Sequence, residues 1–365
     1  MPGVYISYPF CGQKCTYCNF SSGVFPRQLE QRYITALLEE MARWPRPWQP
    51  QTVYLGGGTP SLMASEDLGR VLEAVGGAPW REATMECAPG TVTEDLAQRW
   101  HGFGITRVSL GVQSFVPMEL ARTGRKHSPA TVAAEMEILR RAGIAHCNID
   151  LIAGLPHQTL ESWRESLDWI RRLDPDHVSV YMLEIDQDSR LGREILLHGP
   201  RYDAPAAPSE DLTAELYEVA AAELAAMGCA RYEISNFARP GQESAHNLKY
   251  WRLEPYAGFG ADAHSSDGRL RWSNVESPAE YVDRMERGQS PVVETTPASP
   301  AEERFFVGLR LMEGVRPTAE EWRRFAAPID RFLEAGLLQR DGDAIRLTAR
   351  GILLSNEVFQ EFLCP

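Results

Sequence analysis

Three of the chain's seven cysteines lie close together near its start, in the stretch YPFCGQKCTYCNF. Cys11, Cys15 and Cys18 follow the spacing C-x-x-x-C-x-x-C. Thiolates are ligands for soft metal ions and for iron–sulfur clusters, and packing alone rarely explains three of them in one short loop. This loop is therefore the first candidate for a metal centre.

Two other kinds of cysteine site fit the spacing less well. A structural zinc site usually takes four ligands from two paired clusters, and the sequence has no second cluster, because His127, His146 and His157 stand singly. A redox disulfide would have an isolated C-x-x-C at the start of a helix. The spacing instead favours a 4Fe-4S cluster held by three thiolates, which leaves one iron open to a small molecule.

Glycines and polar residues also follow the predicted strands further along the chain. The segment GGGTP (56–60) follows the second strand, Glu86 ends the third, GVQSF (111–115) follows the fourth and Asp150 ends the fifth. The carboxyl ends of parallel strands meet at one edge of a sheet, where ligands bind. We therefore expect these residues to gather beside the cysteines.

The elements that must position these residues are short apolar runs alternating with amphipathic stretches over residues 1–185. Strands are predicted in GVYISY, TVYLGG, ATMECA, GITRVSLGV, IAHCNIDLIAG and HVSVYML. Helices are predicted at Arg27–Met41, Glu66–Val75, Glu94–Trp100, Pro129–Ala142 after Ser128, and Leu160–Leu173 after Thr159. Repeated strand–helix units predict an α/β fold with a parallel sheet, and their length suits a partial (β/α)6 barrel.

The pattern changes after residue 185, which predicts two further parts of the chain. Residues 186–299 are expected to extend the barrel with a helix over Ser209–Met227 and the segment RYEISNFARPGQESAHNLKYW. Residues 300–365 are expected to form a smaller α+β, winged-helix-like domain. It would contain helices, a hairpin in LLQRDGDAIRLT that turns at Asp341-Gly342-Asp343, and a final helix ARGILLSNEVFQEFL.

Composition limits the classes of partner. Lys and Arg total 37 against 50 for Asp and Glu, a net charge of −13, and no basic block is present. This balance disfavours broad binding to nucleic acid or anionic membranes. The stretch MPGVYISYPF lacks the pattern of a secretory signal, and no apolar run reaches membrane-spanning length. We therefore expect a cytoplasmic protein without a transmembrane segment.

The chain's total of seven cysteines is odd, which argues against a disulfide framework, and the four outside the loop are scattered. Cys87, Cys147 and Cys229 are expected to be buried structural thiols, because free cysteine packs as a small apolar residue. Cys364 precedes the last residue and is expected to be a tail residue, although a Cys-Pro pair can ligate haem.

By its cysteine spacing the chain resembles the radical S-adenosylmethionine (SAM) superfamily, whose mark is C-x-x-x-C-x-x-C after a first strand. In that family the open iron chelates the cofactor, and one-electron reduction releases a 5′-deoxyadenosyl radical. The resemblance implies that Cys11, Cys15 and Cys18 hold the cluster. It implies SAM contacts, some of them serving a second SAM, for Tyr5, Tyr17, Gly57, Gly58, Thr59, Glu86, Gln113, Arg125 and Asp150. Charge type alone would equally allow Arg125 and Asp150 to be a surface ion pair.

Longer segments narrow the resemblance to the group of oxygen-independent coproporphyrinogen III oxidase and the HemW-type haem chaperones. They are VYISYPFC, YLGGGTPS, RVSLGVQSF, NIDLIAGLP and LTARGILLSNEVFQEFL. The oxidase pattern has a fourth cysteine two residues after the third, where this chain has Phe20. The chaperone branch is marked by H-N-x-x-Y-W, which His246, Asn247, Tyr250 and Trp251 match.

The resemblance therefore implies a haem chaperone that carries a 4Fe-4S cluster and SAM, whose action as an enzyme is left open. Its partners would be haem, haem-accepting membrane or respiratory proteins, and an electron donor for the cluster. Imidazole is a common axial ligand of haem iron, so His246 is expected to bind haem, and His264 in GFGADAHSS could serve instead. The alternative for His246 is a histidine packed among aromatic residues.

Two rival functions use the same fold. The first is radical oxidative decarboxylation of coproporphyrinogen III, which Phe20 disfavours. The second is a radical enzyme acting on RNA through the C-terminal unit, which the acidic charge balance disfavours.

Overall fold

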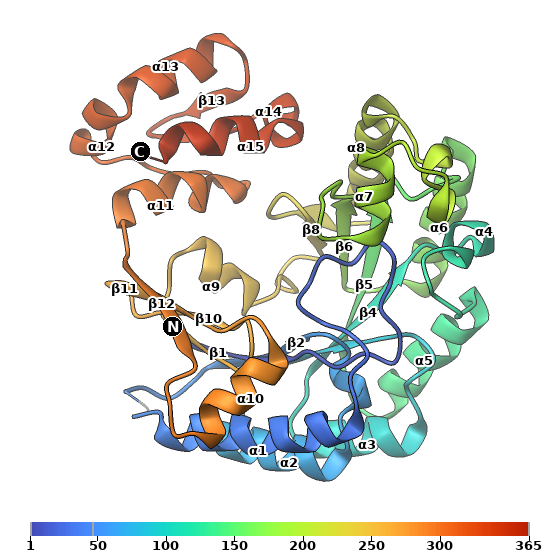
Figure 1. Cartoon of the computed structure of the whole chain (residues 1–365). Coiled ribbons are helices and arrows are strands. Elements are labelled where there is room, and N and C mark those ends of the chain that lie inside the picture. Colours follow the sequence, from blue (N-terminus) through green and yellow to red (C-terminus); the bar gives the residue numbers. More distant parts are fainter. Residues whose placement is uncertain (1, 46, 364–365) are drawn as a thin grey trace.

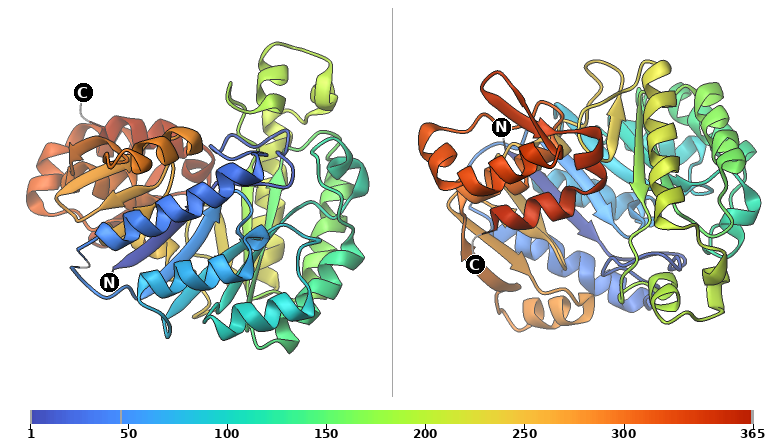
Figure 2. Two further views of the ribbon diagram at one scale, coloured as in Figure 1. Left: turned by 60° about the horizontal axis from the view of Figure 1, so that its bottom comes forward. Right: turned by 90° about the horizontal axis from the view of Figure 1, so that it is seen from above.

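A curved sheet with helices along its outer side makes up most of the molecule, and a smaller, mainly helical unit lies beside one edge of the sheet (Figure 1). The computed structural model describes residues 2–45 and 47–363. Cys364 and the expectation attached to it lie outside these residues. Figure 2 shows the same arrangement from two further sides. The C-terminal unit, in orange to red, lies on the opposite side of the molecule from the teal and green helices of the barrel.

Six parallel strands form the centre of the sheet, in the order of the chain. They are β1 (Gly3–Tyr8), β2 (Thr52–Gly57), β3 (Glu82–Cys87), β4 (Arg107–Gln113), β5 (His146–Ala153) and β6 (His177–Met182). Each is hydrogen-bonded in parallel to the next. The predicted strands and the partial (β/α)6 barrel are therefore confirmed.

The predicted crossover helices are also confirmed. They are α1 (Arg27–Arg43), α2 (Ser65–Val75), α3 (Glu94–Gly102), α5 (Pro129–Arg141) and α6 (Leu160–Leu173). Capping boxes at Ser128 and Thr159 start the last two, since each side chain accepts a hydrogen bond from a free backbone N–H of the first turn. Two short helices were not predicted, η1 (Pro60–Leu62) and α4 (Pro117–Ala121).

Further short strands extend the sheet on both sides, to twelve strands within the described residues. Beyond β6 lie β8 (Asn236–Ala238) and β7 (Ala230–Arg231). Beyond β1 lie β9 (Tyr256–Phe259), β10 (His264–Ser266), β11 (Leu270–Asn274) and β12 (Val292–Pro297). The sequence analysis missed these strands, because they are short and carry few apolar residues. The helices of this region are α7 (Arg190–Leu196), η2 (Arg201–Ala206), α8 (Glu210–Ala226), α9 (Asn247–Trp251) and α10 (Pro278–Glu286).

The C-terminal unit packs around three phenylalanine rings. Phe305 lies 4.6 Å from Phe325 and 4.8 Å from Phe362 between ring centroids. Its elements are α11 (Pro300–Phe306), η3 (Gly308–Arg310), α12 (Ala319–Arg324), α13 (Ala326–Glu334), β13 (Leu338–Asp341), β14 (Ala344–Leu347), α14 (Ala349–Leu353), α15 (Ser355–Phe359) and η4 (Gln360–Phe362). The hairpin is as predicted, with Gly342 at φ +62° in its turn. The single final helix is wrong, because α14 ends at Leu353 and α15 begins at Ser355.

The three-part division at residues 185 and 299 stays a proposal. The strands β9 to β12, which come from residues 256–297, complete the same sheet as the barrel core. Because these strands belong to the same sheet, we propose that residues 186–299 extend the barrel rather than form a separate unit.

Side chains alternate strictly across the six central strands, which decides where chemistry can occur. The outward residues are apolar and buried under the helices, for example Val4, Ile6, Val53, Leu55, Met85, Val108, Leu110, Ile149, Leu151, Val178 and Val180. The inward residues are nearly all polar, for example Tyr5, Thr52, Tyr54, Glu82, Thr84, Glu86, Arg107, Ser109, Asn148, Asp150, His177, Ser179 and Tyr181. Successive residues of a strand face opposite sides, so polar side chains line the concave side of the sheet, which we call the polar chamber.

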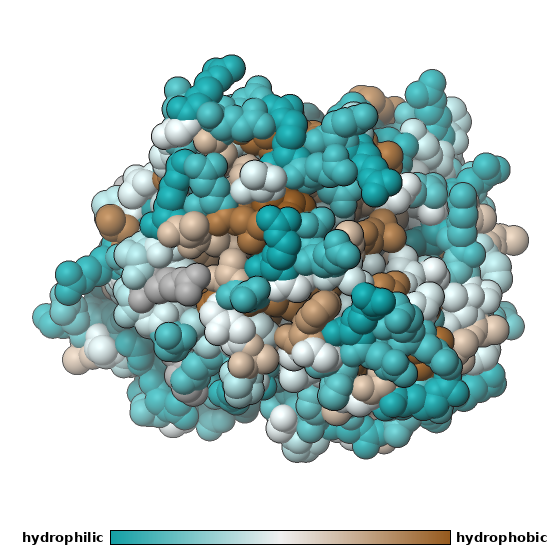
Figure 3. Space-filling view, turned by 90° about the horizontal axis from the view of Figure 1, so that it is seen from below, coloured by the Kyte–Doolittle hydropathy of each residue, from teal (hydrophilic) through white to brown (hydrophobic). Residues whose placement is uncertain are grey.

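The outer surface of the barrel is more hydrophilic than its core. Seen from below, the side that carries α1, α2 and α3 is mainly hydrophilic, with apolar side chains gathered in small patches (Figure 3). Within residues 2–45 and 47–363, every helix is too short or too polar to cross a bilayer.

Candidate functional site

The three cysteines lie in a loop, residues 9–23, that continues from the carboxyl end of β1; we call it the cysteine loop. Two backbone hydrogen bonds close it, from Gly23 N to Pro9 O (2.9 Å) and from Cys11 N to Gly23 O (2.8 Å). Its middle is held by Thr16, whose N donates to Thr123 O (3.1 Å) and whose O accepts from Leu191 N (2.8 Å). The loop is therefore fixed by the barrel on both sides.

The thiols of the cysteine loop are free, partly exposed and near one another. Cys18 Sγ lies 3.8 Å from Ser22 Oγ. Burial raises the pKa of Cys11, against hydrogen bonds from Thr59 and Ser22 that lower it. Within the described residues, no three His, Cys, Asp or Glu side chains converge on a single ion. A 4Fe-4S cluster binds each thiolate to a different iron, so three separate thiols on one fixed loop fit it.

Gly56 and Gly57 end β2 and Gly58 follows it, and each of the three is close to different groups. Gly58 passes directly under the cysteine loop, where a Cβ would lie 2.7 Å from Pro9 C and 2.7 Å from Tyr8 O. Gly57 has φ +101°, a conformation that favours glycine. A Cβ on Gly56 would lie 3.0 Å from Glu86 Oε1. The segment therefore joins the cysteine loop to the carboxylate at the end of β3.

That carboxylate, Glu86, is held by two donors at the rim of the polar chamber. Tyr54 Oη donates to Oε1 (2.9 Å) and Gly57 N donates to Oε2 (3.2 Å). Burial raises the pKa of Glu86 to about 7, and the nearby charge of Asp150 adds to this effect. The group can accept hydrogen bonds from hydroxyls of a bound molecule.

We expect Glu86→Gln to remove part of the pH dependence of stability. The pKa of Glu86 rises on folding from its usual value of 4.5 to about 7, so in this window the folded protein holds a proton that the unfolded chain releases. The group's stabilising contribution is full below pH 4.5 and is lost as the pH rises through about 7. Urea unfolding of the cluster-free protein should therefore show a smaller loss of stability over this window in Glu86→Gln than in the wild type.

The control for this measurement is Glu137→Gln on the exposed face of α5. This variant should follow the wild-type pH dependence. A Glu86→Gln curve parallel to the wild type across the window would contradict the raised pKa.

A second carboxylate, Asp150, lies in the same chamber. Ser109 Oγ donates to its Oδ2 (2.9 Å) and Asn148 Nδ2 donates to its Oδ1 (2.7 Å). Burial raises the pKa of Asp150, while hydrogen bonds from Ser179, Ser109 and Asn148 and the charge of Arg125 oppose the rise. No direct ion pair joins Arg125 to Asp150 among the described residues, so the simple surface pair is not what the structure shows.

Gln113 ends β4, and Arg125, which lies between α4 and α5, contacts the cysteine loop. Arg125 Nε donates to Tyr17 Oη (3.2 Å), one residue before Cys18. Gln113 has φ +71°, a strained conformation for a residue with a side chain, at an irregularity in the pairing of β4 with β5. A Cβ on Gly111 would lie 3.0 Å from Gln113 Nε2 and 3.2 Å from Arg125 Nη2, so this glycine makes room for both.

The structure thus gathers the residues that the resemblance singled out around the chamber and the cysteine loop. The sequence analysis missed Tyr54, Ser109, Asn148 and Ser179, which hold the two carboxylates. The signal that could have found them is the alternation of polar and apolar residues within strands that otherwise read as apolar runs.

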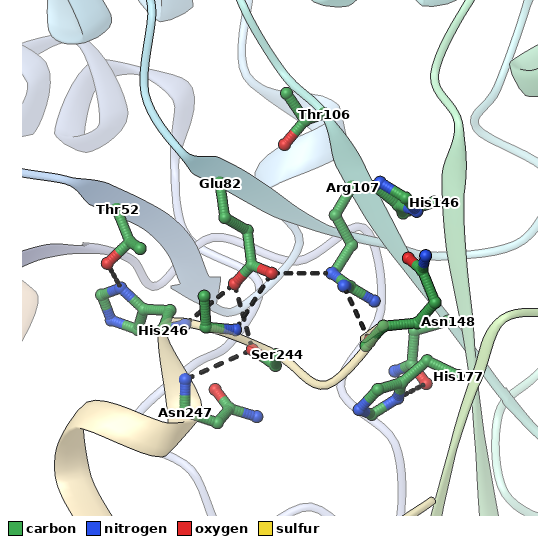
Figure 4. A network of polar contacts seen from close by, with 12 residues as sticks. Thr52, Glu82, Thr106, Arg107, His146, Asn148, His177, Ser244, His246 and Asn247 are labelled. Carbon is green, nitrogen blue, oxygen red and sulfur yellow. Dashed lines mark hydrogen bonds and ion pairs between the residues drawn. The ribbon is translucent and has the colours of Figure 1, made fainter. Parts of the chain in front are cut away.

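Residues 239–254, which we call the floor segment, contact the first residues of β2, β3 and β4, at the end of these strands opposite the cysteine loop; Figure 4 shows part of this contact. Glu82, at the start of β3, is its anchor. Its two carboxylate oxygens accept hydrogen bonds from Ser244 Oγ (3.2 Å), Ala245 N (3.1 Å) and His246 N (2.9 Å). Arg107 Nε donates to Glu82 Oε2 (3.1 Å), and its Nη2 donates to Gln242 O (3.0 Å).

His246 of the H-N-x-x-Y-W motif lies in this floor and is fully buried. Its Nδ1 is 2.8 Å from Thr52 Oγ1 and its Nε2 is 2.8 Å from Tyr250 Oη. Burial lowers its pKa to about 3, which keeps the ring neutral. The expectation that His246 ligates haem is not supported by this geometry, because an axial ligand needs a free ring nitrogen. His246 instead matches the alternative of a histidine packed among aromatic residues.

Comparison with known protein families gives two matches that together span most of the chain. Residues 5–170 match the family model described as the Radical SAM superfamily. Residues 295–354 match the HemN C-terminal domain. The first match contains the cysteine loop, Glu86 and Asp150, and the second contains most of the C-terminal unit.

Curated proteins similar to this chain align along its whole length. The Heme chaperone HemW of Bacillus subtilis is 34% identical, over 100% of this chain and 99% of its own. The Heme chaperone HemW of Mycobacterium tuberculosis is 36% identical, over 99% of this chain and 94% of its own. Among solved structures, Escherichia coli coproporphyrinogen III oxidase superposes with a TM-score of 0.83 at 21% identity, over 99% of this chain and 89% of that chain. This structural similarity shows that the chain and the oxidase share a fold.

Proposed function

Because this chain belongs to the radical SAM superfamily and, within it, to the family of the HemW haem chaperones, we propose that it binds haem and hands it to haem-requiring proteins. The observation that carries this proposal is the full-length identity of 34% and 36% to two curated haem chaperones. The position of Phe20, 65% exposed where the oxidase pattern has a cysteine, adds support.

The cluster and SAM belong to the same proposal. Cys11, Cys15 and Cys18 would hold the cluster, which supplies one electron to the cofactor's sulfonium when it is reduced. Glu86 would accept hydrogen bonds from cofactor hydroxyls, and the backbone after β2 would approach the cofactor closely because its glycines carry no side chains. The other residues proposed to contact SAM are Tyr5, Tyr17, Gly57, Gly58, Thr59, Gln113, Arg125 and Asp150.

We place this activity in the cytoplasm, with a reductant for the cluster and haem-accepting proteins of membranes or of respiration as its partners. Haem would be cargo rather than a resident group, so it must bind stably and still be released to the recipient. An RNA substrate is not part of the proposal, since the net charge of −13 disfavours it.

The second candidate function is oxidative decarboxylation of coproporphyrinogen III, which the fold shared with the oxidase favours. One experiment separates the two. The full chain, reconstituted anaerobically with iron and sulfide, is titrated with haem and, in parallel, incubated with coproporphyrinogen III, SAM and a reductant. We expect saturable haem binding with a shifted Soret band and no protoporphyrinogen. Stoichiometric protoporphyrinogen, or the absence of any haem binding, would overturn the chaperone proposal.

A further inference from the structure

The floor segment and the cofactor end of the chamber are connected by one side chain, Tyr54. Its ring lies against His246, with 5.3 Å between ring centroids. Its hydroxyl donates to Glu86 Oε1 over 2.9 Å. A single residue therefore contacts the H-N-x-x-Y-W motif at one end and the proposed SAM-binding carboxylate at the other.

We propose that His246 is a positioning residue for the cofactor site, acting through Tyr54 on Glu86, and that the imidazole available to haem is that of His264. Both statements rest on the proposed function. The two histidines would then serve different ligands, although each could be taken for a haem ligand from the sequence.

His246 is suited to hold Tyr54 because its own position is fixed. Thr52 at the start of β2 and Tyr250 of the floor segment hold its two ring nitrogens at 2.8 Å each. The ring is neutral and fully buried, so it packs as a flat, rigid surface. Tyr5 stacks on Tyr54 with 6.1 Å between centroids, which leaves the tyrosine little freedom to turn away from Glu86.

The position of Tyr54 matters for Glu86 because few groups near this carboxylate favour its charged form. The Tyr54 hydroxyl and Gly57 N lower the pKa of Glu86, while burial and the charge of Asp150 raise it. The other titratable groups that face Glu86 are Tyr5 on β1, Tyr181 on β6 and Tyr250 on α9. Loss of the Tyr54 donor should therefore raise the pKa of Glu86 further and weaken the site for a ligand with hydroxyls.

His264 is the histidine that the concave side of the sheet leaves accessible. It is exposed at the start of β10, and its ring makes no hydrogen bond within the described part of the chain. By the strand pleat it shares a face with Ser266, which lines a cavity of about 220 Å³ together with Tyr250 and Tyr256. Its backbone lies beside Gly258, and Gly258 is paired on its other side with Tyr5.

A flat macrocycle also needs exposed apolar surface, which the cysteine loop supplies. Phe20 of the cysteine loop is 65% exposed. Its neighbour Ser21 donates a hydrogen bond to Glu276 Oε1 (2.6 Å). Burial raises the pKa of Asp262, against the opposing effects of His264 and of Ser21. Asp262 is therefore close to both His264 and Ser21, and Ser21 follows Phe20 in the chain.

Two other histidines have ring nitrogens that neighbouring side chains engage. Both ring nitrogens of His177 are engaged, by Asn148 at 2.6 Å and Tyr232 at 2.8 Å. His157 is paired with Asp203 at 2.9 Å. His198, beyond α7, is exposed and offers a matched control.

The test compares two ligands across a set of variants of the full, anaerobically reconstituted chain. SAM is titrated by equilibrium dialysis, and haem by its Soret band. Tyr54→Phe and His246→Phe should each weaken SAM about tenfold and leave the haem spectrum unchanged. His264→Ala should lose the shifted Soret band and bind SAM as the wild type does. His198→Ala should match the wild type for both ligands.

Two further measurements keep the test independent of folding and of the cluster. Tyr217→Phe removes another buried tyrosine hydroxyl, which donates to Ile234 O far from the site, and should not change SAM affinity. In cluster-free protein, the folded state loses stability as Glu86 ionises. Tyr54→Phe and His246→Phe should both move this loss to higher pH. If His246→Phe fails to fold, Tyr54→Phe carries the first statement alone.

The outcomes distinguish a failure of the proposed function from a failure of the role given to His246 or to His264. Wild-type protein that binds no haem removes the chaperone function and the role of His264, while the SAM titration still decides the role of His246. A lost Soret shift in His246→Phe with unchanged SAM affinity overturns the positioning role. An unchanged Soret band in His264→Ala, or its loss in His198→Ala, overturns the assignment of His264.

Discussion

Replacing Glu82 by alanine should lower the free energy of unfolding by about 3–5 kcal/mol. The Glu82 and Arg107 side chains are only 7% and 4% exposed, so the variant leaves a guanidinium buried without its partner. It also leaves Ser244 Oγ and the backbone N–H groups of Ala245 and His246 without their acceptor. Urea unfolding followed by circular dichroism measures the loss, and the floor segment should become protease-sensitive first.

Two controls separate a buried pair from a surface pair. Asp95→Ala breaks the Arg99–Asp95 pair, whose side chains are 54% and 72% exposed, and should cost at most about 0.5 kcal/mol. The double variant Glu82→Leu, Arg107→Met should recover part of the stability, because it removes both charges from the interior. A Glu82→Ala variant as stable as Asp95→Ala would show that water reaches the floor and solvates Arg107.

Gly58→Ala should have the second large effect, through the cysteine loop. The added methyl would meet Pro9 C, Tyr8 O and Phe10 O at 2.7 to 2.8 Å, and these are backbone atoms that cannot turn aside. We expect a loss of about 3 kcal/mol of stability and little cluster after reconstitution, because the loop must move to make room. Cluster content is measured from iron, sulfide and visible absorbance per chain.

Gly102→Ala is the matched control for this substitution. It lies at the end of α3 with no atom within 4 Å of its would-be Cβ and without a positive φ. Alanine there should leave the cluster content unchanged and make the chain slightly more stable, since it restricts the unfolded state. A Gly58→Ala protein with full cluster content would show that the loop is not held in the position described.

Much of the barrel could be predicted from the sequence because its signals are local. Each of the six strands is a short run with outward-facing apolar residues, and helices such as α5 and α6 begin at recognisable capping residues. Glu86 and Asp150 could be found because strand ends meet at one edge. The spacing of Cys11, Cys15 and Cys18 needed no structure at all.

The rest depends on contacts between distant parts of the chain. Nothing local in the sequence shows that residues 239–254 contact the barrel at the end opposite the cysteines, so His246 could be taken for an open ligand. The neighbours that engage it, Thr52 and Tyr250, come from β2 and from α9. The strands β9 to β12 are short, and β10 to β12 contain many polar residues, which weakens their signal.

The pairing of β1 sets an order of events during synthesis. One edge of β1 pairs with β2, but the other pairs with β9, which begins at Tyr256. The floor that anchors on Glu82 also comes from residues near 246. A growing chain on the ribosome therefore exposes an unpaired edge beside the cysteines until about two thirds of it has been made. Such long-range pairing is slow to form, so iron–sulfur insertion should follow translation of β9 rather than accompany that of the cysteine loop.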